Sequence, residues 1–104
     1  MARTTEYPRE LAEHFGRNLR RARRRADYSQ EELSLVCDMH RTAIGLLENG
    51  ARLPRLDSIV KLASGDNVEP SVLIDGIAWH PGAPKRSGFY IAGERLPWPV
   101  ERPG

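Results

Sequence analysis

Two short helical patterns separated by a tight break constrain this sequence more than any other feature. Ser29 suits a helix N-cap, and Glu32 three residues later completes a capping box that opens the first pattern. The second pattern starts at about Arg41 and stops at Gly50, a residue typical of helix C-termini. Two short helices joined by such a turn form a helix-turn-helix unit, which can place its second helix in the major groove of DNA.

Apolar residues at helical spacing predict which side of each helix is buried. In the first helix they are Leu33, Val36 and Cys37, and in the second they are Ile44 and Leu47. Cys37 is the only cysteine of the chain. Because the sequence offers it no partner for a disulfide or a metal site, we interpret Cys37 as a small buried apolar residue.

Several residues of this stretch agree in register with one known motif. The chain has Ser29-Gln30, Leu33-Ser34 and Ile44-x-x-Leu47-Glu48-Asn49-Gly50. With these residues it resembles the Cro/CI-type helix-turn-helix family of phage repressors, also called the xenobiotic-response-element family. The resemblance covers residues 15–76. It implies an all-α fold: a five-helix, phage-repressor-like helix-turn-helix domain followed by a short C-terminal tail, for which a β-hairpin is one arrangement.

Three further helices are expected around the motif. A long amphipathic helix runs from Pro8 to about Ala26, a fourth helix begins at Pro54, and a short fifth helix covers residues 70–75. The fourth helix is expected to end near Ser64, because Gly65 and Asp66 follow where the family has an aliphatic position. The residues expected to face inward are Leu11, Phe15, Leu19 and Ala22, then Leu56, Ile59, Val60, Leu62 and Ala63, then Val72 and Leu73.

The composition changes after residue 76, so we predict a DNA-binding domain over residues 1–76 and a separate tail over residues 77–104. The tail is rich in proline and holds both tryptophans, and Phe89–Ile91 can form a strand that pairs with Ile77–Trp79. A lone hairpin is marginal in water. The tail therefore docks on the helical body, pairs across a dimer or stays partly disordered, and Trp79 and Trp98 are its docking residues.

Composition excludes several classes of function. With 104 residues, 39% of them hydrophobic and 29% charged, the chain suits one small soluble domain. It has no apolar run of transmembrane length and no signal-peptide core, so we expect a cytoplasmic protein with no membrane partner. It also lacks a phosphate loop, a nucleophile elbow and metal-ligand spacing among its histidines. We therefore expect no enzyme, no metal and no cofactor.

The charge is uneven along the chain. Residues 1–64 hold 12 of the 16 basic residues but 9 of the 14 acidic ones, an excess that mildly favours a nucleic-acid partner. Most of the arginines of the first helix are interpreted as a solvated face. Arg23 differs, because the resemblance implies a structural ion pair between Arg23 and Glu48 that links the first helix to the third.

The resemblance also implies that the second helix of the motif reads DNA. With Ile44 and Leu47 inward, the predicted base-reading residues are Arg41, Thr42 and Leu46. Arg41 can contact guanine, Thr42 can contact a base or a thymine methyl, and Leu46 can contact only such a methyl. The predicted phosphate contacts are Gln30, His40, Asn49, Arg52 and Arg55. For His40 a helix-capping role is an equal alternative, and for Arg52 and Arg55 the alternative is solvated loop charge.

These expectations indicate a sequence-specific, double-stranded DNA-binding transcriptional regulator, most often a repressor that acts as a homodimer. An alternative from another class is an antitoxin-like or adaptor protein-interaction module. In that case the tail or Leu46 would bind a protein partner.

Overall fold

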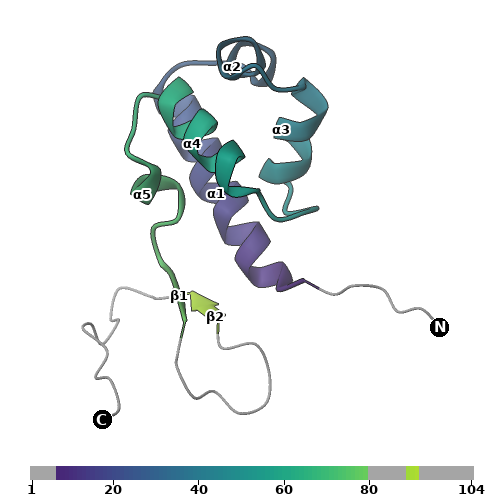
Figure 1. Ribbon diagram of the computed structural model, residues 1–104, viewed down its shortest axis with the longest axis vertical. Helices are drawn as coiled ribbons and strands as arrows, with labels where there is room; N and C mark the ends of the chain where they lie inside the picture. The colour runs from purple at the N-terminus through teal and green to yellow at the C-terminus, as the bar shows by residue number, and fades with distance from the viewer. Residues whose placement is uncertain (1–6, 80–88, 92–104) are drawn as a thin grey trace, which may run out of the picture.

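The structure is a computed structural model that describes residues 7–79 and 89–91 (Figure 1). It confirms five helices and a two-stranded hairpin. In chain order they are α1 (Arg9–Arg25), α2 (Gln30–Cys37), α3 (Arg41–Glu48), α4 (Leu56–Gly65), α5 (Pro70–Leu73), β1 (Ile77–Trp79) and β2 (Phe89–Ile91). None of the helices in these described ranges is long and apolar enough to cross a membrane.

The long helix α1 is the element against which most of the others pack. Helices α3 and α5 lie against it, α2 packs on α3 and α4, and the hairpin lies near its N-terminal end (Figure 1). The expected stripe of α1 is largely confirmed, although Leu11 is only half-buried. The largest fully buried side chains come from all five helices and are Phe15, Leu19, Leu33, Ile44, Leu62 and Leu73.

Gly16 allows α1 and α3 to approach closely. A Cβ atom at Gly16 would lie 2.5 Å from the carbonyl oxygens of both Leu47 and Glu48, which is too close for any side chain. A second link fixes α5, because the buried Asn18 amide donates hydrogen bonds to the carbonyl oxygens of Leu73 and Asp75 at 3.0 and 2.9 Å. Thus α1 positions α3 on one side and α5 on the other.

The helix-turn-helix unit forms as its local residues predict. Ser29 accepts a hydrogen bond from the Glu32 amide, and the Glu32 carboxylate accepts one from the Ser29 amide, so both halves of the capping box are present. After α2, Asp38 adopts a left-handed backbone with φ of 55°, which ends the helix. Gly50 has φ of 71° just beyond α3.

Some of the predicted inward residues are wrong. Helix α4 starts at Leu56, not at Pro54, and Leu56 is 77% exposed. Its buried side is centred on Leu62 and Ala63, and at about 100° per residue this orientation places Leu56 and Val60 on the flank. Val36 on α2 and Val72 on α5 are exposed for the same reason. The side of each helix that contacts the core is narrower than the side that carries its apolar residues.

The hairpin belongs to the described part of the tail. Its strands are antiparallel, with Ala78 opposite Tyr90 and Trp79 opposite Phe89, and the Trp79 and Phe89 rings meet edge to face with their centres 5.0 Å apart. Ala78 is buried. The other proposed docking residue, Trp98, lies outside the described residues.

Candidate nucleic-acid interface

Helix α3 has one buried and one exposed side. Ile44 and Leu47 are buried in the core, whereas Arg41 and Thr42 are exposed and Leu46 is 38% exposed. The three residues predicted to read bases therefore share the outward side of the helix. Their helix is only eight residues long, so its orientation depends on tertiary contacts rather than on its own stability.

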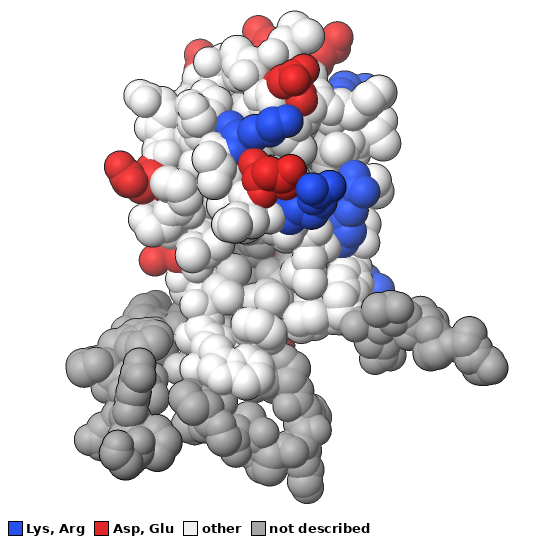
Figure 2. Space-filling model, in the orientation of Figure 1, with Lys and Arg blue, Asp and Glu red and all other residues white. Residues whose placement is uncertain are grey.

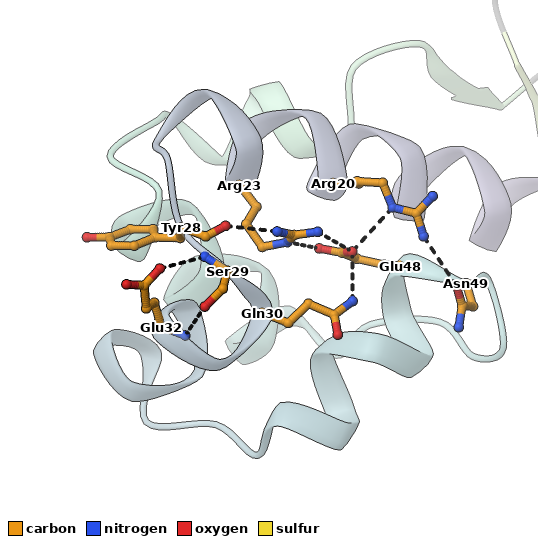
Figure 3. Close-up of polar contacts among 8 residues, drawn as sticks. All are labelled: Arg20, Arg23, Tyr28, Ser29, Gln30, Glu32, Glu48 and Asn49. Carbon is orange, nitrogen blue, oxygen red and sulfur yellow. Dashed lines mark hydrogen bonds and ion pairs between the residues drawn. The ribbon is translucent and has the colours of Figure 1, made fainter.

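One set of these contacts is made by a buried carboxylate at the end of α3, that of Glu48. Figure 3 shows that Arg20 and Arg23 from α1 and Gln30 from α2 all point toward the Glu48 carboxylate. Arg23 donates to both oxygens, at 2.6 Å to Oε2 and 3.0 Å to Oε1, while Gln30 Nε2 lies 3.0 Å and Arg20 Nε 3.3 Å from Oε1. Arg23 also donates to the Tyr28 carbonyl oxygen at 2.8 Å. This network joins three helices at one point.

The network explains the charge state of Glu48. Burial alone would raise the pKa of this carboxyl group, but hydrogen bonds from Arg23 and Gln30, together with the positive charge of Arg23, lower it below its ordinary value. The hydrogen bonds between Arg23 and Glu48 act in the opposite direction on Arg23 and raise its pKa. Both groups therefore stay charged at neutral pH, and the C-terminal end of α3 is fixed to α1.

Two members of this network were not recognised from the sequence. Arg20 was interpreted as part of a solvated face, although it precedes Arg23 by one helical turn and so shares its side of α1. Gln30 was predicted to bind phosphate, but its amide nitrogen is engaged by Glu48. No local pattern connects Gln30 with a residue 18 positions away.

The remaining predicted phosphate contacts surround the two ends of α3. His40 is the N-cap of α3 and is exposed, but its side chain makes no capping hydrogen bond. Asn49 is exposed and accepts a hydrogen bond from Arg20 at 3.3 Å. Arg52 and Arg55 are exposed, and Arg55 forms a surface ion pair with Asp57 at 3.3 Å.

A few acidic and basic side chains are scattered over the mostly uncharged face seen in Figure 2. Such a surface attracts DNA only where basic side chains are free to reach phosphates. Among residues 7–79 and 89–91, no group of histidine, cysteine and acidic side chains is placed to hold a metal ion. The exposed side chains around α3 suit contact with the surface of a partner molecule.

A helix-turn-helix family model (HTH_3) matches residues 19–73, which is more than half of the chain. The chain belongs to this family. The match spans the network around Glu48, both helices of the motif and α5.

Relatives from several bacteria support the same assignment. Control protein C.BamHI of Bacillus amyloliquefaciens is 40% identical over 62 residues, which are 59% of this chain and 76% of that protein. The restriction-modification controller protein C.AhdI of Aeromonas hydrophila is similar in structure, with a TM-score of 0.58, 35% identity and coverage of 60% of this chain and 94% of that chain.

A hypothetical transcription factor from Neisseria matches with a TM-score of 0.60 and 28% identity, over 70% of this chain and 86% of that chain. Family, fold and relatives agree on one class: this chain is a DNA-binding regulator of transcription.

Proposed function

We propose that this chain is a sequence-specific repressor that acts as a homodimer and reads double-stranded DNA with α3. The observation that carries this proposal is the contrast between the two sides of α3. Its inner side is fixed by Ile44, Leu47 and the Glu48 network, while Arg41, Thr42 and Leu46 face outward. A rigidly held helix with a free outer side suits insertion into a major groove.

The outward residues suit contacts with different groups on the bases. Arg41 lies in the first turn of α3, where it can donate two hydrogen bonds to the O6 and N7 atoms of a guanine. Thr42 can contact either a base edge or a thymine methyl, and Leu46 one turn later can contact only a methyl. Gly45, between Thr42 and Leu46, has no side chain, which lets the helix backbone approach the duplex closely there.

Of the groups predicted to bind DNA phosphates, Arg52 is the most favourably placed. It is exposed beyond the end of α3, and no acidic side chain pairs with it among the described residues. Arg55 can also reach phosphate after it releases Asp57, since exposed pairs of this kind contribute little. The N-terminus of α2 is less favourable for an anion, because Glu31 and Glu32 occupy its first turn.

A dimer is proposed because one small reading head buries too little surface for tight specific binding. Exposed apolar side chains at α5 and the hairpin (Val72, Ile74 and Trp79) suit a subunit interface away from α3. C.AhdI is named a restriction-modification controller protein. The similarity to it supports a role for this chain in regulating restriction-modification genes.

Selection of duplexes from a random pool, with the solution mass measured in parallel, tests this function. We expect enrichment of a two-fold symmetric site whose half-sites lie about one helical turn apart, or a multiple of it, and a dimeric mass on DNA. A protein with its Thr42 and Leu46 both replaced by Ala serves as the control and should lose the enrichment. Failure to enrich any duplex would refute the proposal.

The alternative function as a protein-interaction module has one observation in its favour. Leu35 and Val36 on α2 are exposed large apolar residues, and Leu46 on α3 is partly exposed. A purified protein that binds no duplex at any salt concentration but forms a stable 1:1 complex with another polypeptide would establish this alternative.

A further inference from the structure

One exposed face of α1 is lined with arginines and points away from the core. Its members are spaced by three and four residues, so they lie side by side on the helix. They surround a shallow hollow of about 490 Å³ that, within the described part of the chain, is lined by arginines alone. We call this surface the arginine face; it consists of Arg17, Arg20, Arg21, Arg24 and Arg25.

The positive charge of the arginine face is largely unneutralised. No acidic residue occurs between residues 17 and 25. Glu48 is shared by Arg20 and Arg23, and the one hydrogen bond of the Arg21 side chain within residues 7–79 and 89–91 goes to the neutral amide oxygen of Asn18, at 3.4 Å. For Arg17 and Arg24 the described residues offer no ion pair or hydrogen-bonded side chain, and both are exposed. Such a concentration of like charge attracts a polyanion.

The dimensions of the arginine face suit a nucleic-acid backbone. Residues 17–25 span about 12 Å along the helix axis, given a rise of 1.5 Å per residue. A DNA strand carries one phosphate per about 3.4 Å of duplex axis, so a segment of this length presents about three phosphates. Guanidinium groups bind phosphate oxygens with two parallel hydrogen bonds, which makes arginine better suited to this task than lysine.

The arginine face is continuous with the proposed reading surface. Arg20 Nη2 donates to Asn49 Oδ1 at 3.3 Å, and Asn49 is the C-cap of α3 (Figure 3). One edge of the arginine face therefore touches the end of the helix that reads bases. A duplex held by α3 could therefore reach the arginine face by extending past Asn49.

We propose that the arginine face binds backbone phosphates of the duplex held by α3, outside the base pairs that α3 reads. This inference rests on the function proposed above and extends the footprint of the protein without adding base recognition. Because phosphate contacts carry no sequence information, they strengthen binding to any flanking sequence equally.

The experiment compares two duplexes that contain the same selected site. The short duplex ends at the site, and the long one continues for about one helical turn on each side. The test variant is Arg17→Gln/Arg24→Gln, because both side chains are exposed and Gln preserves helix propensity. The matched control, Arg9→Gln/Lys61→Gln, removes two exposed positive charges elsewhere. Thermal unfolding verifies that both variants fold.

For the unmodified protein we expect a steeper salt dependence of affinity on the long duplex than on the short one. The test variant should lower the slope on the long duplex by about two units, since each phosphate contact contributes about 0.9. It should leave the short duplex unchanged, and the control variant should behave like the unmodified protein on both.

Equal behaviour of test and control variants on both duplexes would overturn the inference, as would an equal loss on the short and long duplexes. Binding of polyglutamate that the test variant alone loses, with DNA binding intact, would instead assign the arginine face to an acidic polypeptide. If the unmodified protein binds neither duplex, the proposed function itself fails, and this inference fails with it.

Discussion

Two buried carboxylates in this protein have opposite surroundings. Glu48 at the end of α3 and Asp66 at the end of α4 are each only 4% exposed. Glu48 accepts hydrogen bonds from Arg20, Arg23 and Gln30. Neither oxygen of Asp66 has a hydrogen-bond partner in the described structure. The comparison shows that burial does not by itself determine what a charged group contributes; its partners do.

The pKa values of the two groups move in opposite directions. For Glu48, hydrogen bonds outweigh the effect of burial and lower the pKa. For Asp66, burial raises the pKa to about 6, and the charge of Glu48 adds to this effect while that of Arg23 opposes it. The neighbouring Cys37 thiol has its pKa raised to about 11 by burial, so it stays neutral beside Asp66.

The largest effect is expected when Glu48 is removed. Among the described residues, Glu48→Ala leaves Arg23 with the Tyr28 carbonyl oxygen as its one hydrogen-bond acceptor, and the protein should lose on the order of 3 kcal/mol of unfolding free energy at pH 7. Urea denaturation measures this loss. The control is Glu31→Ala, an exposed position that should change stability by less than about 0.5 kcal/mol. Equal stability of the two variants would show that the network contributes nothing.

The next effect concerns Asp66 and depends on pH. Its pKa is raised in the folded state, so the stability it contributes is complete below about pH 4 and is lost as the pH rises through about 6. Asp66→Asn removes this loss. The variant should match the unmodified protein near pH 4 and exceed it by about 2–3 kcal/mol at pH 7. Urea denaturation across this range provides the measurement.

Asp57→Asn is the control for Asp66, because Asp57 is an exposed carboxylate on the same helix. It shows what the loss of one carboxylate from this helix does at each pH, apart from the burial of Asp66. If Asp66→Asn produces the same stability difference at pH 4 and pH 7, Asp66 ionises normally and the contrast with Glu48 disappears. The lowered pKa of Glu48 predicts the opposite behaviour: stability is lost as the pH falls below the ordinary glutamate range.

The smallest effect separates Arg20 from Arg23 within the Glu48 network. The Arg20 side chain is 38% exposed and contacts Glu48 at 3.3 Å, so Arg20→Ala should cost less than about 1 kcal/mol. Arg23→Ala should cost several times more, because that side chain is nearly buried and donates twice to Glu48 and once to the Tyr28 carbonyl oxygen. Arg24→Ala, on the same helix but exposed, is the control for both. Equal losses of unfolding free energy for the Arg20 and Arg23 variants would show that the exposure of each side chain does not determine how much it stabilises the protein.

The sequence predicted the elements well because their signals are local. The capping box at Ser29 and the helix end at Gly50 each depend on a few adjacent residues. The strand pair Ile77–Trp79 and Phe89–Ile91 was also predicted from composition and flanking turns.

The rotation of each helix was harder to predict. Val60 and Val72 have apolar side chains at plausible spacing, yet both are exposed, because the contact of α4 and α5 with the core is narrower than their hydrophobic pattern. The sequence also predicted only part of the hydrogen-bond network around Glu48. Arg23 followed from the family motif, whereas Arg20 and Gln30 depend on how three helices meet. The assignments to bases and phosphates stay predictions.

The most direct test of the account is the binding of Arg41→Ala to the selected duplex and to each of its single-base variants. If α3 is held by Glu48 so that Arg41 reads a guanine, the substitution should cost about 1–3 kcal/mol on the preferred duplex and abolish discrimination at one base pair only. Arg52→Ala, as the comparison, should weaken all duplexes alike. If Arg41→Ala also weakens every duplex by the same factor, Arg41 binds phosphate and the proposed reading face is wrong.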